Sequence, residues 1–429
     1  MRAPSPRVLL AASLVLFAIT AIGVVLTRHG RAPATTPAAV PQPAPAPPPP
    51  AVRVTAGAFA AVVSWRGDPA APVSWGPAGM RPLLRAAGRD GRLPLGALFP
   101  NTRYRVSVGG VGTATFRTAL VPPTARAATG GGVLRVDGAP FFPLIAWEEC
   151  PGRWAPDLAA GVNLFGGNPC TGLSNLLTAL RGRALAAGTT EDVPGTTGPG
   201  LIGWFLADEA DARGYTETTL PAPGGPGIRF LTLTSHFFPL AAPLPAGRGM
   251  YPGLAAKADV LGVDLYPLQE LCRPELLPWV FDAQRELLRL AGGKPTFQWI
   301  EEREMKCPQT PVTPATIRAE AWLAIAGGAT GLAFFPSDWS PGVTYVIRGI
   351  ANRIRQLEPA LLTRPRPVIV TPAAPTVRAS AREFGGRRYV IAVNAGTAAA
   401  RVALDGVEVT LPPLGVRLLV GDEQALRLG

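Results

Sequence analysis

The stretch LIGWFLADEAD, from Leu201 to Asp211, holds the pattern from which the fold can be worked out. Seven mostly apolar residues, Leu201–Ala207, run directly into the carboxylates of Asp208 and Glu209. An apolar run of this length, bounded by polar residues, is typical of a strand that is buried on both faces of a parallel sheet. Two acids at the end of such a strand indicate either a solvated loop or one half of an acid/base pair.

Further apolar runs lie between Phe141 and Phe335, and segments of helical pattern alternate with them. The additional runs are Phe141–Trp147, Gly161–Phe165, Ala184–Gly188, Phe230–Ser235, Asp259–Pro267, Pro295–Glu301 and Thr330–Phe335. Two intervening segments, Pro278–Gly293 and Ala315–Gly328, have the pattern of helices that stop at glycine. Together the eight strands predict a (β/α)8 TIM barrel over residues 131–365, with its active site at the carboxyl ends of the strands.

The first 30 residues contain a membrane-targeting signal. Arg2 and Arg7 precede Val8–Leu26, a run of 19 residues without a charge, which is about the length needed to cross a bilayer. No convincing small-x-small cleavage site follows, so we expect an uncleaved signal anchor, with a cleaved signal peptide as the alternative. The Pro-rich segment Arg31–Ala51 is predicted to be an extended spacer that places the later domains outside the cytoplasm.

Two further regions show short strands separated by turn residues. They predict a β-sandwich over residues 52–120 and a small antiparallel β domain over residues 366–429. The segment LFPNTRYRV, Leu98–Val106, resembles the tyrosine-corner pattern of the fibronectin type III module, in which Tyr104 would form the corner and Trp65 would be a core residue. The expected chain is therefore multidomain, with a fibronectin III-like sandwich, a TIM barrel and a C-terminal β domain.

Cysteine content and charge limit the partners of the protein. With four cysteines in no CxxC pair and only two histidines, no metal or other cofactor is expected. In an exported chain the even number predicts two disulfides, and we expect Cys150–Cys170 and Cys272–Cys307 because these partners follow neighbouring strands. The net charge is +12, but the arginines are scattered along the sequence, so no nucleic-acid partner is expected.

A second pair of adjacent acids, Glu301 and Glu302, ends the seventh predicted strand. Cleavage of a glycosidic bond needs two carboxyl groups that face each other, one protonated to donate to the leaving oxygen and one ionised. Acids at the ends of the fourth and seventh strands would meet this requirement across the mouth of a barrel. A solvated loop remains the alternative for either pair.

The segments DGAPFFPLIAW, GWFLADEAD, DVLGVDLYP and KPTFQWIEE together resemble the glycoside hydrolase clan A barrels, in particular bacterial β-galactosidase-like and cellulase-like proteins. The resemblance implies a retaining hydrolase that acts on a poly- or oligosaccharide outside the cytoplasm. By the same resemblance Glu209 would be the acid/base and Glu301 the nucleophile. Tyr266 would contact the nucleophile and Trp339 would be a platform under the sugar.

Strand periodicity adds candidates and leaves one assignment open. Asp264 and Tyr266 alternate with apolar residues, so both should point into the barrel. Trp147, at the end of the first strand, could stack on a sugar. On the seventh strand, an inward Gln298 would favour Glu302 as the nucleophile, whereas the resemblance favours Glu301.

Asp208 stands where the clan usually has asparagine. As a substrate-binding neighbour, a buried Asp208 would raise the pKa of Glu209, which suits an acid. The same departure also supports a rival interpretation, in which the chain is a non-catalytic glycan-binding or envelope-organising surface protein built on a degenerate barrel.

Overall fold

The computed structural model describes residues 51–335, 339–421 and 426–427. The predicted signal anchor and nearly all of the Pro-rich spacer lie outside the described residues. Within the described ranges, no helix is both long and apolar enough to cross a membrane.

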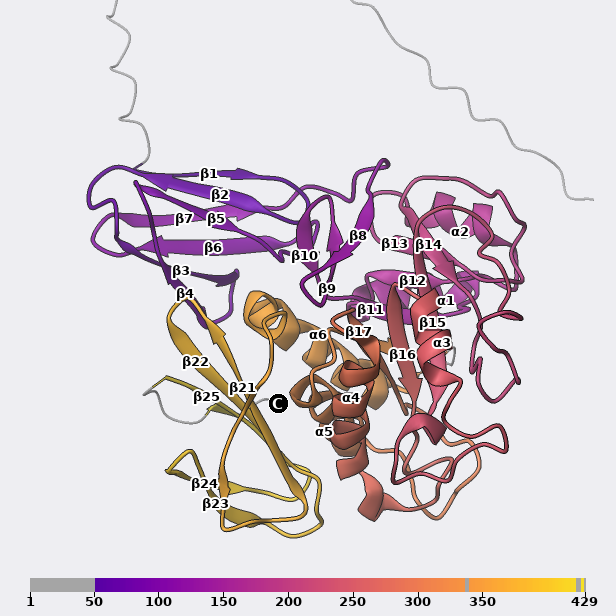
Figure 1. Ribbon diagram of the computed structural model, residues 1–429. Coiled ribbons are helices and arrows are strands. Elements are labelled where there is room, and N and C mark those ends of the chain that lie inside the picture. Colours follow the sequence, from indigo (N-terminus) through magenta and orange to yellow (C-terminus); the bar gives the residue numbers. More distant parts are fainter. Residues whose placement is uncertain (1–50, 336–338, 422–425, 428–429) are drawn as a thin grey trace, which may run out of the picture. The chain divides into compact units, whose positions relative to one another are not determined.

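The N-terminal region forms two antiparallel sheets with the strand orders β1-β2-β5 and β4-β3-β6-β7 (Figure 1, indigo). Their strands are β1 (Val52–Ala56), β2 (Ala61–Trp65), β3 (Pro72–Pro77), β4 (Leu84–Ala87), β5 (Arg92–Leu95), β6 (Arg103–Val108) and β7 (Gly112–Arg117). The Tyr104 hydroxyl accepts a hydrogen bond of 3.0 Å from the backbone N–H of Phe99. Trp65 is buried in the same core. The predicted sandwich and its tyrosine corner are therefore confirmed.

A small antiparallel sheet that we did not predict precedes the barrel. It contains β8 (Ala127–Gly130), β9 (Val133–Val136) and β10 (Ala139–Phe141), in the order β10-β9-β8. Leu134 and Phe141 share one apolar cluster with Ile145 and Ile228, which lie at or near the beginnings of barrel strands. The sheet therefore packs on the amino-terminal end of the barrel, away from the predicted active site.

Eight parallel strands form a closed barrel in sequence order, and this confirms the predicted fold (Figure 1). They are β11 (Leu144–Trp147), β12 (Leu164–Gly166), β13 (Leu185–Gly188), β14 (Leu201–Phe205), β15 (Ile228–Thr234), β16 (Val260–Asp264), β17 (Thr296–Ile300) and β18 (Gly331–Phe334). The first and last strands pair directly, with Ile145 opposite Ala333, so the sheet has no free edge.

Two of the eight barrel strands are not followed by a helix. Six α-helices follow the strands: α1 (Pro151–Ala160), α2 (Leu173–Leu180), α3 (Tyr251–Lys257), α4 (Pro278–Ala291), α5 (Pro314–Gly327) and α6 (Pro341–Leu361). Two short 3-10 turns, η1 (Ser235–Phe237) and η2 (Pro274–Leu276), complete the helical elements of the described ranges. The connections after β13 and β14, residues 189–200 and 206–227, contain no helix. Both are rich in proline, glycine and threonine, which disfavour helix.

Aromatic side chains fill the barrel. Phe205 stacks on Phe230 with ring centroids 4.9 Å apart, and Phe297 contacts both rings. Gly262 on β16 is required here, because a Cβ atom at this position would lie 2.1 Å from the Phe297 ring. The inward direction predicted for the Gly262–Asp264–Tyr266 face of this strand is confirmed. On β17 the inward residues are Phe297 and Trp299, whereas Gln298 faces outward and its amide donates to the carbonyl of Val263.

The C-terminal region forms two antiparallel sheets, in the orders β19-β21-β22-β25-β26 and β20-β23-β24 (Figure 1, yellow). Their strands are β19 (Arg366–Pro367), β20 (Val370–Thr371), β21 (Val377–Phe384), β22 (Arg387–Asn394), β23 (Ala400–Leu404), β24 (Val407–Leu411), β25 (Val416–Val420) and β26 (Leu426–Arg427).

A fully buried arginine on β21 joins this region to the barrel. Arg382 donates to the carbonyl of Leu361 at 3.4 Å and to that of Ile325 at 2.5 Å, so it caps the carboxyl ends of α6 and α5. The Ser380 hydroxyl donates to the carbonyl of Ala326 at 2.6 Å, at the carboxyl end of α5. Cationic and hydroxyl donors at helix carboxyl ends satisfy orphan carbonyls and oppose the helix dipole.

Candidate functional site

The acids after β14 lie at the mouth of the barrel, which is the end where the strands have their carboxyl termini. Asp208 lines a pocket there and forms an ion pair with Arg213 at 3.4 Å. Glu209 has a backbone φ of 45°, a left-handed conformation that is uncommon outside glycine and is often found at functional sites. Burial raises the pKa of Glu209, and the nearby charges of Asp208, Glu270 and Asp211 raise it further.

A third acid at the mouth, Glu148, was missed by the sequence analysis. It follows β11, has a φ of 50°, and lines the same pocket as Asp208. Burial raises the pKa of Glu148 to about 7, with further increases from Glu191 and Asp208. The available signal was the acidic pair in IAWEEC directly after the first predicted strand, the same arrangement that singled out the fourth and seventh strands.

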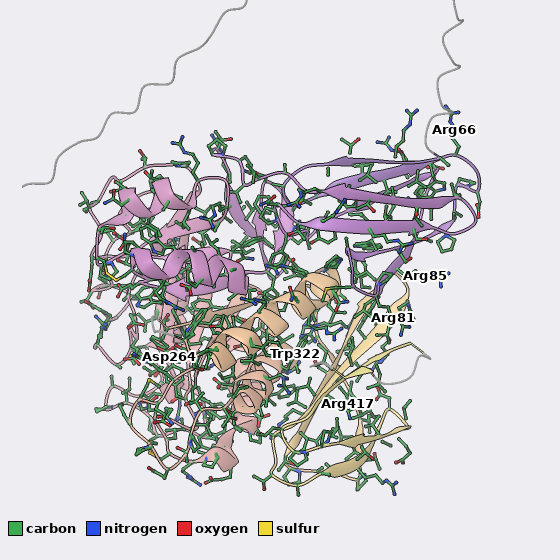
Figure 2. The ribbon with its side chains drawn as sticks, turned by 180° about the vertical axis from the view of Figure 1, so that it is seen from behind. Arg66, Arg81, Arg85, Asp264, Trp322 and Arg417 are labelled. Atoms are coloured by element: carbon green, nitrogen blue, oxygen red, sulfur yellow. A yellow bond between two sulfur atoms is a disulfide. The ribbon has the colours of Figure 1, made fainter. Side chains whose placement is uncertain are left out.

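Asp264 and Tyr266 connect the two groups of acids. The Tyr266 hydroxyl donates a hydrogen bond of 2.7 Å to Asp264 Oδ1, and both side chains are buried inside the barrel (Asp264 is labelled in Figure 2). Burial raises the pKa of Asp264 well above its ordinary value, and the charges of Asp208 and Glu209 act in the same direction. Tyr266 in turn lies within electrostatic range of Glu302.

The carboxylate of Glu301 is held by backbone donors of the loop after β16. Gln269 N–H donates to Glu301 Oε1 at 2.7 Å, and Leu268 N–H approaches both oxygens at 3.1 and 3.2 Å. Behind it lies the buried Glu320 of α5, which accepts from the backbone N–H of Glu301 at 3.2 Å. Burial raises the pKa of Glu301 to about 7 even though the two amides favour its ionised form.

The carboxylate of Glu302 has a different environment. Only 4% of the residue is exposed, and neither carboxylate oxygen accepts a hydrogen bond of normal geometry among the described residues, although the backbone N–H groups of Phe335 and Glu302 are near enough to favour its ionised form. Burial raises its pKa well above the ordinary value, and Glu149 adds to the increase. A buried carboxyl group without partners is costly unless it is neutral or meets a ligand.

The two predicted aromatic platforms lie in different places. Trp147 lines the pocket beside Asp208. The centroid of its ring lies 4.7 Å from that of Phe205 and 5.7 Å from that of Trp299. Trp339 is 6% exposed; its ring lies 5.9 Å from Phe334, and the guanidinium of Arg153 lies 5.5 Å from the ring centroid. The structure thus brings Trp147, but not Trp339, to the pocket at the mouth.

Two adjoining pockets form an acidic cleft at the mouth. The inner pocket, of about 70 Å³, is lined by Trp147, Glu148 and Asp208. The outer pocket, of about 490 Å³, extends over the loops after β12 and β13 and shares Glu148, Thr189 and Glu191 with the inner one. Arg213 is the one cationic side chain among their lining residues. A ligand in this cleft would lie in a mainly negative field.

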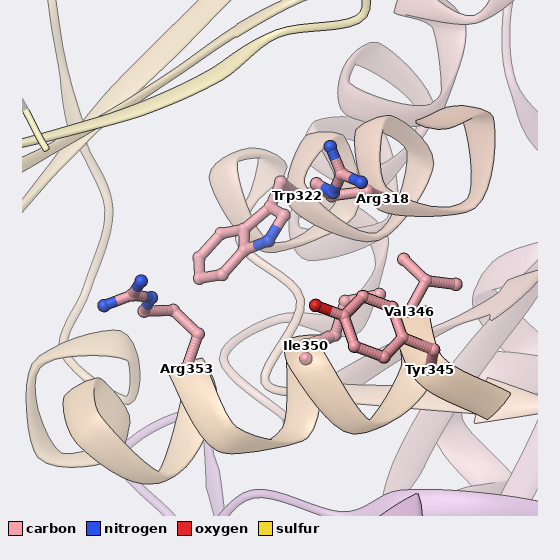
Figure 3. A pocket seen from close by; sticks show the side chains of 7 residues that line it. Arg318, Trp322, Tyr345, Val346, Ile350 and Arg353 are labelled. Atoms are coloured by element: carbon pink, nitrogen blue, oxygen red, sulfur yellow. The ribbon is translucent and has the colours of Figure 1, made fainter. Parts of the chain in front are cut away.

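A separate pocket between α5 and α6 has none of these features (Figure 3). It has a volume of about 50 Å³ and lies on the outer ring of helices. Arg318 and Trp322 come from α5, and Tyr345 and Arg353 from α6. No carboxyl group lines it, so we assign it no part in the chemistry.

Two disulfides brace the loops at the mouth. Cys150–Cys170 joins the loops after β11 and β12, and Cys272–Cys307 joins those after β16 and β17. The predicted pairing is therefore confirmed. Each bridge links loops that neighbour the acids described above.

Comparison with known proteins gives a likeness of fold only. No protein-family model and no curated protein matches the chain. Among solved structures it is similar to the β-glucuronidase of Ruminococcus gnavus, with 10% identity, a TM-score of 0.37, and coverage of 71% of this chain and 67% of that chain. It is also similar to the Lactobacillus rhamnosus β-glucuronidase, with 13% identity, a TM-score of 0.38, and coverage of 71% and 67%.

Proposed function

We propose that the chain is a retaining glycoside hydrolase that acts outside the cytoplasm. One observation carries the proposal: in a closed parallel barrel, the acids after β14 lie within electrostatic range of the buried Asp264, and Glu302, after β17, lies within range of its hydrogen-bond partner Tyr266. Two carboxyl groups placed on either side of a reacting bond are the requirement for glycosidic cleavage. The two disulfides support a site of action in an oxidising compartment.

In the proposed reaction Glu209 is the acid/base. It gives its proton to the glycosidic oxygen as the bond from that oxygen to the anomeric carbon breaks. A carboxylate after β17 attacks the same carbon and forms a glycosyl ester. Water then attacks the anomeric carbon, Glu209 takes the proton of that water, and the ester bond breaks to free the enzyme. The raised pKa of Glu209 fits its first role, because it favours the protonated form that donates to the leaving oxygen.

We propose Glu302, rather than Glu301, as the nucleophile. The oxygens of Glu301 are engaged by the N–H groups of Leu268 and Gln269, whereas neither oxygen of Glu302 accepts a hydrogen bond of normal geometry among the described residues, and the residue lies within electrostatic range of Tyr266. A nucleophile needs a free oxygen that can reach carbon. Burial favours the protonated form of Glu302, so the proposed role requires that this group ionise when substrate binds.

The negative charge of the acidic cleft limits which sugars can be substrates. Glu148, Glu191 and Asp192 line its outer part, and a carboxylate-bearing sugar would meet like charges there. Such repulsion lowers the affinity of the protein for the sugar and slows their association. We therefore propose a neutral or amino-bearing glycan as the substrate, with Trp147 as the stacking surface and Asp208 as a polar contact in the inner pocket.

The test is a trapping experiment with neutral and amino-sugar 2-fluoroglycosides, which form slowly hydrolysed esters with a carboxylate nucleophile. Mass spectrometry of the digested protein should locate the label on Glu302. Substitution Glu209→Gln should lower kcat by about 10²–10⁴-fold. Glu302→Gln should abolish labelling, whereas Glu301→Gln should retain it. A label on Glu301 would move the nucleophile by one residue, and turnover that persists in all three variants would refute the proposal.

The rival function is a non-catalytic glycan-binding protein, and the engagement of Glu301 by backbone donors favours it. If the rival is right, oligosaccharides should bind with unchanged affinity to Glu209→Gln and Glu302→Gln, and no sugar of the panel should be hydrolysed by the unsubstituted chain.

A further inference from the structure

A pocket of about 790 Å³ opens at the end of the barrel opposite the acids. Its lining includes Lys294 and Thr330, which precede β17 and β18, and the carboxyl end of α4. The segment from Leu362 to Pro367, which leads from α6 into β19, completes it. Because the catalytic candidates follow the strands and these residues precede them, the two sites lie at opposite ends of the barrel. We call this pocket the basic groove.

The charge of the basic groove has one sign. Five cationic residues line it and no acidic residue does. The cations are Arg285, Arg289, Lys294, Arg364 and Arg366. A concave surface lined by charges of one sign focuses the field and concentrates counter-ions.

Two of the five cations have partners within the protein. Arg289 is paired with Glu286, and Lys294 Nζ donates to the carbonyls of Ala255 and Ala258 at 2.7 Å each. For Arg285, Arg364 and Arg366, no side-chain hydrogen bond or ion pair is found within the described residues. Three unpaired positive charges therefore remain.

The ends of nearby helices do not account for these charges. The carboxyl ends of α4, α5 and α6 approach the groove, and each carries a partial charge of roughly −0.5. Arg382 already donates to the ends of α5 and α6, and Lys294 caps the end of α3. Even without any cap, the three ends of α4, α5 and α6 would together carry about −1.5, which is less than the charge of the three unpaired arginines.

We propose that the basic groove binds a linear acidic polysaccharide that carries carboxylate groups. The guanidinium group matches a carboxylate in a two-pronged contact, and three such groups along one pocket suit a repeating anion. Glycines 131, 132, 293 and 328 also line the groove, so a polymer chain can approach the backbone closely. A concave pocket fits a polymer chain better than a flat bilayer surface.

A polymer bound in the basic groove is not the polymer that the mouth would cleave. The groove and the mouth are at opposite ends of the barrel and have opposite charge. The groove would therefore hold the protein on an acidic matrix while the mouth remains free. This inference does not rest on the proposed hydrolase activity.

The test compares two variants with the same net charge. In the groove variant Arg285, Arg364 and Arg366 are changed to Gln; in the control variant the exposed Arg53, Arg66 and Arg89 of the sandwich are changed to Gln. Binding of oligogalacturonate to the full chain is measured by calorimetry, with dextran as a neutral probe and with melting curves as a check of folding. We expect the groove variant to bind at least about tenfold more weakly and the control variant to bind as the unsubstituted chain does.

Affinity should also fall as salt is raised, and less so in the groove variant, because salt screens the charges. Equal losses in the two variants would mean that net charge alone is responsible and would overturn the proposal. Equal binding of dextran, or no saturable binding at low salt, would overturn it as well. Arginine-dependent retention on phosphatidylglycerol vesicles without oligogalacturonate binding would instead make the groove a lipid contact.

Discussion

Tyr266 donates a 2.7 Å hydrogen bond to Asp264, and the two residues face different groups of acids. The carboxyl group of Asp264 lies within electrostatic range of Asp208 and Glu209, whereas the phenol of Tyr266 neighbours Glu302. The pair therefore links the acids after β14 with those after β17 inside the barrel. A change in the charge of one group of acids should therefore affect the other group through this hydrogen bond.

The first prediction concerns this link. Substitution Tyr266→Phe leaves the buried Asp264 without its donor, which should lower the free energy of unfolding by about 1–3 kcal/mol. It should also raise the pKa of Asp264 further, since the hydrogen bond favours the ionised form. Denaturant unfolding measures the first effect. Tyr345→Phe is the control, because that side chain is 77% exposed. Equal stability of the two variants would contradict the prediction.

The second prediction concerns pH. The pKa of Glu301 is about 7 in the folded protein, against an ordinary value of 4.5. Between these values the folded state binds more protons than the unfolded state, so the free energy of unfolding should fall as pH rises from about 4.5 to 7. Glu301→Gln should flatten this dependence when unfolding is measured at pH 5, 6 and 7. The exposed Glu304→Gln should not, and an unchanged slope in Glu301→Gln would refute the assignment.

The third prediction concerns Arg382, which is fully buried and whose hydrogen bonds to the described residues go to carbonyls and a hydroxyl. Substitution Arg382→Met would leave carbonyls at the ends of α5 and α6 without a donor. We expect a loss of about 2–4 kcal/mol in the free energy of unfolding. Arg401→Met, at an exposed position, should change it by less than about 0.5 kcal/mol. Comparable midpoints in guanidinium chloride for both variants would show that the caps contribute little.

The fourth prediction concerns the disulfides. Removal of Cys150–Cys170 by a double substitution to Ala frees a loop that spans 20 residues in sequence, which should cost about 3 kcal/mol of stability through chain entropy. Removal of Cys272–Cys307, with a separation of 35, should cost slightly more because loop entropy grows slowly with length. Thermal unfolding with and without reductant measures both losses. Loss of Cys272–Cys307 should also lower the hydrolase activity proposed above, because this bridge braces the loop after β17, which carries Glu302.

Hydrophobic patterning was enough to predict much of the fold. The predicted runs Leu201–Ala207 and Asp259–Pro267 contain the observed strands β14 and β16. They could be recognised because strands that are buried on both faces are apolar along their length. The missing helices after β13 and β14 were not predicted, although both connections are rich in helix-breaking residues. The sheet from Ala127 to Phe141 was missed because its strands are short and lie beside the first barrel strand in sequence.

The candidate site was predictable in position but not in detail. Strand-end acids such as Glu209 can be read from sequence, since the carboxyl ends of barrel strands meet at one mouth. The sequence does not show which of Glu301 and Glu302 is held by hydrogen bonds. That depends on the loop after β16, whose backbone N–H groups donate to Glu301. The direction of Gln298 likewise followed from the aromatic packing around Phe297 and Trp299, which no local pattern encodes.

The sequence by itself determined the order of the domains, the closed parallel barrel, the disulfide pairs and the ends of the strands where acids gather, because these follow from local periodicity and from chain connectivity. Only the tertiary structure decided which acids are buried, which donors they meet, and that Arg285 of α4 shares one groove with Arg364 and Arg366, about 80 residues later in the chain. Burial and charge neighbourhood depend on contacts between elements far apart in the chain, and a pattern along the chain does not contain them.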